Sequence, residues 1–445
     1  MVMPTEGRTG AVAAIGLAAA LLLWPAFWNG YPLVFSDTGT YLSQAIEHYI
    51  GWDRPIFYSL FLLPLHLTLT TWPAIAVQAL LVAHVLHLVR RTLLPDTSVW
   101  WLLPLAGAMT LVSSLPWFVS QLMPDIFTGV LVLVLALLIF APEHLSRRER
   151  IWLMVFATFM IAAHQSHVLL ALALLAVLLP LRGAMALQGV APLALAVVAL
   201  LSVNVIAFGR ASLSPFGNVF LLARVIYDGP GADVLRRDCP AVGWRLCASV
   251  DRLPAGADDF LWRDDGPVAQ SGGAKLVSRE ADAIIAAALR AEPGRELLAF
   301  ARNAARQLTL FATGDGLQAW PTTVTPWIER EFPRSEAAAY AASRQNAGML
   351  EVPAWMQALH LATALAGIAA CVALLLSAPR RRMPGHLTAG FAAAALLALL
   401  ANAAITGGLS GPHDRYQSRI MWLPPLIAVL GIASLRTVAG PVFSR

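Results

Sequence analysis

The run AVAAIGLAAALLLWPAFWN, residues 11–29, decides the fold of this chain. It is long and apolar enough to cross a bilayer, since about 18 consecutive apolar residues suffice for a transmembrane helix. A polar stretch, residues 30–55, follows directly and contains FSDTGTY at positions 35–41. The same alternation of apolar run and short polar segment recurs along the chain. It predicts an all-α polytopic membrane protein.

The composition supports this class and excludes others. Of 445 residues, 58% are hydrophobic and 13% are charged, whereas a soluble globular protein carries about 25% charged residues. The net charge of +5 does not indicate nucleic-acid binding, because the arginines cluster in short loops between apolar runs. Arg8 precedes the first run, which lacks a small-x-small cleavage site and is expected to stay as an anchor.

The apolar runs predict ten membrane spans and one surface helix. Residues 56–70 are apolar but short and contain Pro64, so we expect a helix lying at the membrane surface. The predicted spans are residues 11–29, 73–89, 98–119, 125–142, 151–163, 168–182, 187–208, 355–378, 386–405 and 420–436.

The positive-inside rule orients these spans. With 56–70 outside the membrane, the arginines next to the spans fall on one side, and both termini are expected in the cytoplasm. These arginines are Arg8, Arg90, Arg91, Arg147, Arg148, Arg150, Arg182, Arg380, Arg381, Arg382 and Arg436. The chain then divides into an N-terminal transmembrane module (1–208), an extracytoplasmic domain (209–354) and three C-terminal spans (355–445).

The 209–354 region holds 16 of the 31 basic and 17 of the 26 acidic residues, and helical spacing of its apolar residues predicts a mostly helical domain. Cys239 and Cys247 lie in it. Outside the cytoplasm they would meet an oxidising compartment, which favours a short-loop disulfide over two unpaired thiols.

Two acids on the predicted outer face are candidate catalytic residues. Asp37 lies between apolar residues and Tyr41, an environment that can suit a carboxylate to general-base work; alternatively, it caps the helix that starts near Thr38. Asp125 follows Pro124 at the start of a span, where capping is again the alternative. Acids at membrane depth are costly and are therefore functional candidates.

Histidines and arginines on the same face could bind an anion. His164 and His167 occupy a tip between two spans, and we favour phosphate binding there over a metal, because the sequence offers no third ligand nearby. Arg54, Arg415 and Arg419 lie next to apolar runs; such arginines either fork onto phosphate or extend to lipid headgroups. The sequence contains no nucleotide-binding or Ser-hydrolase motif.

In the order of these parts the chain resembles the membrane-embedded GT-C glycosyltransferases, especially the protein O-mannosyl and lipid A aminoarabinose transferases. The resemblance covers roughly 1–210 and 355–436. The chain departs from the family pattern at two places. Thr38 stands where the family often has a second acid, and His164 and His167 stand where the tip commonly carries a lysine. The matching pieces are Asp37 in FSDTGTY, RPIFYS from Arg54, Arg90-Arg91, SLPWFVSQLMPD ending at Asp125, the tip His164–His167, Asp414-Arg415-Tyr416 and Pro424-Pro425.

The resemblance implies a bacterial inner-membrane enzyme with its site on the periplasmic face. It would move a sugar from a polyprenyl phosphate to an envelope glycan, lipid or protein, with inversion and with Asp37 as base. Asp125 would position the acceptor. If the reaction requires a divalent cation, Asp37 and Asp125 would hold it together. Implied substrate-binding residues are Tyr41, Asp53, Arg54, Tyr58, His164, His167, Arg415 and Tyr416. The helix 56–70 would guide the prenyl chain.

Two other functions compete with this one. A lipid or polysaccharide transport protein would line a pathway with polar groups near mid-membrane, but the sequence shows no inverted repeat. A non-catalytic scaffold would use the 209–354 domain to bind a partner. Only an enzyme requires these distant residues to converge on one outer-face site: Asp37, Arg54, Asp125, His164, His167 and Arg415.

Overall fold

A computed structural model describes residues 7–182, 187–377 and 385–439. The described chain is built of helices, and its one β contact is an isolated bridge between Leu33 and Gln121. This confirms the predicted all-helical class. The arginines expected at 380–382 lie outside the described residues.

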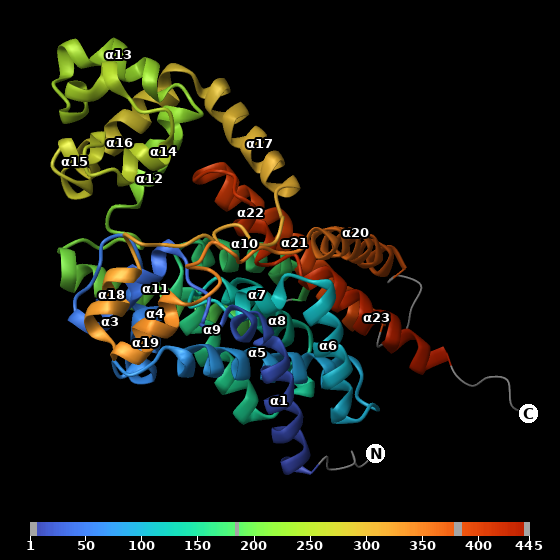
Figure 1. The fold of residues 1–445 in the computed structure, drawn as a ribbon. Helices are drawn as coiled ribbons and strands as arrows, with labels where there is room; N and C mark the ends of the chain where they lie inside the picture. The colour runs from blue at the N-terminus through green and yellow to red at the C-terminus, as the bar shows by residue number, and fades with distance from the viewer. Residues whose placement is uncertain (1–6, 183–186, 378–384, 440–445) are drawn as a thin grey trace, which may run out of the picture.

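The N-terminal helices follow the apolar runs closely (Figure 1). The predicted span 98–119 is broken at Ser113 and Ser114 into separate helices. The elements are α1 (Arg8–Leu22), α2 (Trp24–Asn29), α3 (Ser36–Glu47), α4 (Ile56–His66), α5 (Trp72–Leu93), η1 (Val99–Trp101), α6 (Leu102–Val112), α7 (Leu115–Val119), α8 (Ile126–Phe140), η2 (Pro142–His144), α9 (Arg147–Ala163), α10 (Gln165–Arg182) and α11 (Leu187–Phe208).

The second half of the chain begins with short helices and returns to long apolar ones. The elements are α12 (Gly217–Tyr227), α13 (Gly231–Val242), η4 (Arg245–Arg252), α14 (Ala257–Trp262), α15 (Pro267–Gln270), α16 (Ala274–Ala291), α17 (Pro293–Thr309), α18 (Thr325–Glu331), α19 (Arg334–Ala341), α20 (Ala354–Ser377), α21 (Gly385–Leu409), α22 (Asp414–Ser418) and α23 (Leu423–Ala439).

Four of the described helices are long and apolar enough to cross a membrane: Trp72–Leu93, Leu187–Phe208, Ala354–Ser377 and Leu387–Leu409. The other apolar helices are shorter. α4 has 11 residues, about 16 Å of helix against a hydrocarbon core of about 30 Å. The structure therefore supports membrane character but shows four candidate spans where the sequence predicts ten.

Helix α8 is the centre of the bundle. Each of its 15 residues is buried, and it contacts α5, α9, α10, α11 and α21. A helix that is apolar all round has no solvent face to present and is stable only when other helices surround it. Because α8 starts directly after Asp125, this position fixes Asp125 at the head of the bundle.

Residues 209–354 form two packing units instead of one domain. The first, residues 216–288, has its own apolar core around Val219, Leu222 and Ile284 and projects from one end of the bundle in Figure 1. Cys239 and Cys247 are disulfide-bonded within it, as predicted. The second, residues 311–352, packs on the transmembrane core through Val324 and Ile328.

The second unit is held to the first outer loop by buried polar contacts. Glu336 accepts hydrogen bonds from the Tyr31 hydroxyl at 2.8 Å and from the Thr71 amide at 2.9 Å. Gln345 pairs with the backbone of Val34, accepting from its N–H at 3.0 Å and donating to its carbonyl at 2.7 Å. These contacts fix the chain just before Phe35.

The central position of α8 predicts the effect of a single methyl group. A Cβ at Gly129 would lie 2.6 Å from the ring of the fully buried Trp422. We expect Gly129→Ala to lower the unfolding temperature of the detergent-purified protein, because overpacking a core costs about 1–3 kcal/mol. Gly16→Ala in α1 is the control, since no atom lies within 4 Å of its added Cβ. Equal unfolding temperatures for Gly129→Ala and wild type would contradict the packing described for α8.

Candidate active site

Asp37 is free of the capping role that the sequence allowed it. The cap of α3 is made by Thr38, whose hydroxyl accepts the Phe35 N–H at 2.9 Å and donates to the Leu122 carbonyl at 3.1 Å. Asp37 lies in the first turn of α3, and its carboxylate turns to another part of the chain. The helix start is therefore satisfied without using the acid.

The partner of Asp37 is Arg54. Arg54 Nη2 donates to Asp37 Oδ1 at 2.7 Å, and the two side chains are 19% and 15% exposed. No other hydrogen bond reaches the second carboxylate oxygen, Oδ2, among the described residues, and it is not among their buried unpaired atoms. Asp37 thus has one oxygen held by an arginine and one oxygen open to a proton donor.

The loop that carries Arg54 is held by the 216–288 unit. Trp52 lies against Phe220 and Trp262 with ring centroids 5.9 and 5.8 Å apart. The Arg54 guanidinium lies 5.9 Å from the centre of the Trp262 ring, within cation–π range. Gln165, at the tip between α9 and α10, donates to the Asp53 carbonyl at 3.1 Å. The position of Arg54 therefore depends on the unit outside the bundle.

Asp125 stands at the N-terminus of α8 but does not cap it either. Its side chain is fully buried and lies 3.1 Å from Arg419 Nη1, through Oδ1, and 3.8 Å from Arg415 Nη1, through Oδ2. The second separation is too long for a hydrogen bond, and both Oδ2 and Arg415 Nη1 are left without one. The expected contact of Asp125 with an acceptor does not fit this complete burial.

Arg419 joins Asp125 to the tip between α9 and α10. Its Nη1 donates to His164 Nε2 at 3.4 Å, and its Nη2 donates to the Ser166 hydroxyl and to Asn402 Oδ1, both at 3.1 Å. Burial, followed by the charge of Arg419, lowers the pKa of His164 well below its ordinary value. Nε2 accepts the hydrogen bond from Arg419, because an arginine can only donate, and Nδ1 lies 3.3 Å from the Ser166 backbone nitrogen and 2.9 Å from the Ser166 hydroxyl.

Arg415 lies with its guanidinium over the aromatic ring of Phe35, the first residue of the stretch 35–41. Its guanidinium lies 3.6 Å from the centre of the Phe35 ring, and Phe35 meets Trp320 edge-on at 4.9 Å. Asp315 accepts the backbone N–H of Arg415 at 3.0 Å. Residues 315–320 thus hold Phe35 and Arg415 in contact. Arg415 is buried although its Nη1 has no hydrogen-bond partner among the described residues.

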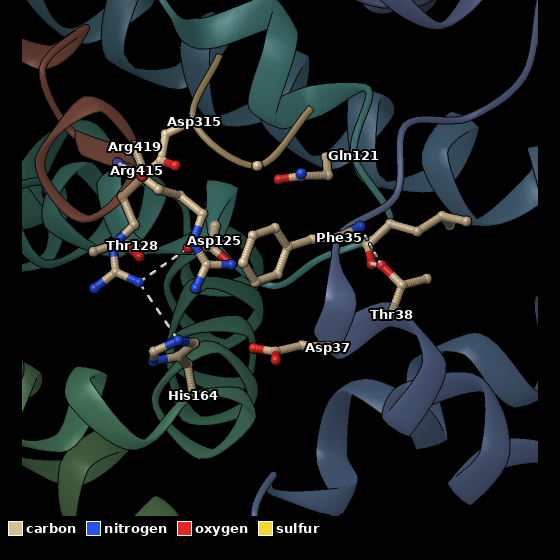
Figure 2. Close-up of polar contacts among 12 residues, drawn as sticks. Phe35, Asp37, Thr38, Gln121, Asp125, Thr128, His164, Asp315, Arg415 and Arg419 are labelled. Carbon is tan, nitrogen blue, oxygen red and sulfur yellow. Dashed lines mark hydrogen bonds and ion pairs between the residues drawn. The ribbon is translucent and has the colours of Figure 1, made fainter. Parts of the chain in front are cut away.

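The two ion pairs belong to one site. Figure 2 shows the carboxylate of Asp37 directed toward the space below Asp125 and Arg415, with His164 at the same level. Asp37 and Asp125 both act electrostatically on Arg415, and both raise its pKa. Five members of the predicted set therefore come together here, namely Asp37, Arg54, Asp125, His164 and Arg415, and the sixth, His167, does not.

The predicted tyrosines divide into two groups. Tyr41 lies one turn after Asp37 on α3, and its buried hydroxyl has no hydrogen-bond partner among the described residues. Burial raises its pKa well above the ordinary value, so the phenol is a neutral donor. Tyr416 is half-buried beside Arg415 and Arg419, 5.4 and 5.5 Å from their guanidinium groups.

Tyr58 and Asp53 support the site from outside it. Tyr58 is fully buried and donates to Gln78 Oε1 at 3.1 Å, so its hydroxyl is used inside the protein and the predicted contact with substrate does not fit its position. Asp53 accepts from the Thr40 hydroxyl at 3.5 Å. Burial raises the pKa of Asp53, and the neighbouring Arg54 opposes that shift.

His167 is a structural residue, contrary to its predicted role in phosphate binding. It is completely buried, its Nδ1 lies 2.7 Å from the Met160 carbonyl, and its Nε2 lies 2.7 Å from the Thr128 hydroxyl. Both ring nitrogens are used, so none remains for a ligand. Only His164 of the predicted pair reaches the site.

The donor set does not fit a divalent cation. Asp37 is bridged to Arg54, and Asp125 lies beside two arginines, so each carboxylate already faces positive charge. The described residues contain no group of three His, Cys, Asp or Glu side chains placed to hold a metal ion.

Sequence reasoning missed the residues that order the site from the C-terminal third. The sequence places Arg419 on the outer face but does not predict its full burial or its contact with Asp125. The available signal was its spacing of four residues from Arg415. Asp315 gave no signal, because it is an ordinary polar residue in a polar segment. Asn402 lies within the predicted span 386–405, where a polar side chain among apolar ones was an available signal.

The chain matches no protein-family model, no curated protein and no solved structure. Function is therefore argued from the geometry of the site.

The burial of Asp125 and the partial exposure of Asp37 predict different stabilities for their amide variants. Asp125→Asn leaves Arg415 and Arg419 buried without a carboxylate, a change that costs about 3–5 kcal/mol. Asp37→Asn breaks a partly exposed pair and should cost about 1 kcal/mol or less. Thermal unfolding of the purified variants, monitored by size-exclusion chromatography after heating, measures the loss of stability in each of the two variants.

The double variant Asp125→Asn/Arg419→Gln separates the ion pair from a general packing defect. We expect it to lose less stability than the two single changes added together, because removing both charges leaves less uncompensated charge. An Asp125→Asn protein as stable as wild type would rule out the role assigned to this pair.

Proposed function

We propose that this chain is an integral membrane glycosyltransferase of the GT-C type. It moves a sugar from a polyprenyl-phosphate donor to an extracytoplasmic glycan, lipid or protein, and Asp37 is the general base. One observation carries the proposal: two acids and three arginines, from four separate parts of the chain, meet at one end of the bundle. A scaffold gives no reason for this convergence, and a transport pathway would place the polar groups along the bundle.

Asp37 has the geometry of a base. Arg54 holds Oδ1, which leaves Oδ2 to accept the proton of an acceptor hydroxyl. The acceptor oxygen then bonds to the anomeric carbon, the bond from that carbon to the phosphate oxygen breaks, and the lipid phosphate leaves with the bonding electron pair. Attack from the side opposite to the leaving group inverts the anomeric centre.

The arginines suit the leaving phosphate. Negative charge grows on the phosphate oxygen as the bond breaks, and preorganised donors stabilise such charge most where water is excluded. Arg415 is buried and its Nη1, 3.8 Å from Asp125 Oδ2, has no hydrogen-bond partner among the described residues, so it can donate to an anion without first breaking a hydrogen bond. Arg54 keeps further N–H groups beside its contacts with Asp37 and the Asp53 carbonyl, and these can donate to the same phosphate.

Asp125 is a positioning residue in this scheme. Its charge keeps Arg415 and Arg419 ionised and oriented at the head of the bundle, while Arg419 fixes His164 and Ser166. Full burial keeps Asp125 from the substrate itself. Its replacement should therefore reduce transfer through the placement of Arg415.

A groove beside the site suits a polar acceptor. It has a volume of about 760 Å³ and is lined by carboxylates that include Asp315, Glu351 and Asp414. Asp315 also accepts the backbone N–H of Arg415, which connects the groove to the site. Carboxylates bind sugar hydroxyl groups well, so the groove suits a polar acceptor held next to Arg415.

The proposal includes a membrane topology. We propose ten spans with both termini in the cytoplasm of a bacterium and the site on the periplasmic face of the inner membrane. It rests on the arginines at the predicted cytoplasmic ends. The helices shorter than a bilayer would cross with help from their flanking segments or a locally thinner bilayer.

Transfer of label tests the proposal. The purified protein is incubated with a panel of radiolabelled polyprenyl-phosphate sugars and membrane extract, and the readout is label in a new product. We expect wild type to transfer one sugar and Asp37→Asn to lose at least about 100-fold, the usual contribution of a general base.

Asp96→Asn is the matched control, because it makes the same chemical change at an exposed loop position and should leave transfer unchanged. Thermal unfolding verifies that Asp37→Asn is folded. Transfer by Asp37→Asn at the wild-type rate would refute Asp37 as the base, and an absence of transfer from every donor would refute the enzyme class.

A further inference from the structure

A hollow with three cationic side chains lies at the end of α11, away from the candidate active site. It has a volume of about 400 Å³ and is lined by Ala207, Phe208, Arg210, Phe216, Lys275 and Arg279. Arg210 follows the last turn of α11, whereas Lys275 and Arg279 are four residues apart on α16 and therefore share one face. Its lining therefore combines two aromatic rings with three positive charges.

These cations have no acidic partners. Within the described residues, no carboxylate forms an ion pair with Arg210, Lys275 or Arg279. Arg210 Nη1 donates to the Pro215 carbonyl and to the Ser278 hydroxyl, both at 3.0 Å, which orients the guanidinium and leaves Nε and Nη2 available.

The acids nearest along α16 are used elsewhere. Glu280 accepts the backbone N–H groups of Arg245 and Leu246 at 2.9 and 3.1 Å. Asp282 accepts a hydrogen bond from Asn218 at 2.9 Å. The positive charge at the hollow is therefore not neutralised by this protein and suits an anion.

The hollow adjoins the exposed apolar surface of α11, which suits contact with lipid chains. α11 is one of the four helices long and apolar enough to cross a membrane. It exposes large side chains along its length: Leu195 is 58%, Val198 60% and Ile206 81% exposed. The cations therefore stand where a membrane-crossing helix ends, which is the level of the lipid headgroups.

We propose that this hollow binds the phosphate of an anionic membrane lipid whose chains lie along α11. Arg210, Lys275 and Arg279 would donate to the phosphate oxygens, and Phe208 and Phe216 would pack against the glycerol region. Cations that merely extended toward headgroups would be scattered over the surface; here three of them surround one hollow of headgroup size. The proposal rests on the membrane placement of α11 and not on glycosyl transfer.

Native mass spectrometry of the full-length protein in detergent tests this site. The probe is phosphatidylglycerol, titrated against wild type and Lys275→Gln/Arg279→Gln. The control is Arg252→Gln/Arg290→Gln, which removes two positive charges from exposed positions in η4 and at the end of α16. Since each cation near a lipid phosphate contributes about fivefold, we expect affinity to fall at least about tenfold in the first variant and to be unchanged in the control.

The remaining outcomes would overturn the proposal. An equal loss in both double variants would mean that phosphatidylglycerol responds only to total charge. Competition by inorganic phosphate at concentrations equal to those of the lipid would mean a site for a soluble anion. Unchanged affinity in Lys275→Gln/Arg279→Gln, with thermal unfolding confirming a folded protein, would mean that lipid binds elsewhere. None of these results bears on sugar transfer, which is measured separately.

Discussion

The ion pair between Asp125 and Arg419 is the constraint on which the head of the bundle depends. Both side chains have no solvent exposure, and neither charge could remain there alone at an acceptable free energy. The pair ties the start of the central helix α8 to the segment before α23. Through His164, Ser166 and Asn402, Arg419 extends the same constraint to α10 and α21.

The other half of the site is held from outside the bundle. Phe35 is fixed by Thr38, by the 311–352 unit and by the guanidinium of Arg415. Gly39 lets the Thr323 carbonyl approach α3 more closely than a side chain would allow. The stretch 35–41 is therefore fixed by contacts with three other parts of the chain. It contains one acid, Asp37, and one oxygen of that carboxylate remains open.

Sequence patterns predicted the helices far better than the site. Apolar runs located the helices because period and length are local properties, and α8 begins within one residue of its predicted start. The break at Ser113 and Ser114 and the division of 209–354 depend on distant packing and could not be predicted locally. Asp37 and Asp125 were correctly singled out as costly acids, but their partners were not assigned. Arg419 lies 294 residues from Asp125, and His167 could be recognised as structural only from its two contacts.

The proposed mechanism requires the lipid phosphate to bind between Arg54 and Arg415, with the open oxygen of Asp37 facing the anomeric carbon. A cryo-electron microscopy structure of the protein with polyprenyl phosphate tests it most directly. We predict phosphate density within hydrogen-bonding distance of both arginines and an intact contact between Asp125 and Arg419. Phosphate density only at other places, with Arg54 and Arg415 unchanged, would contradict the claim.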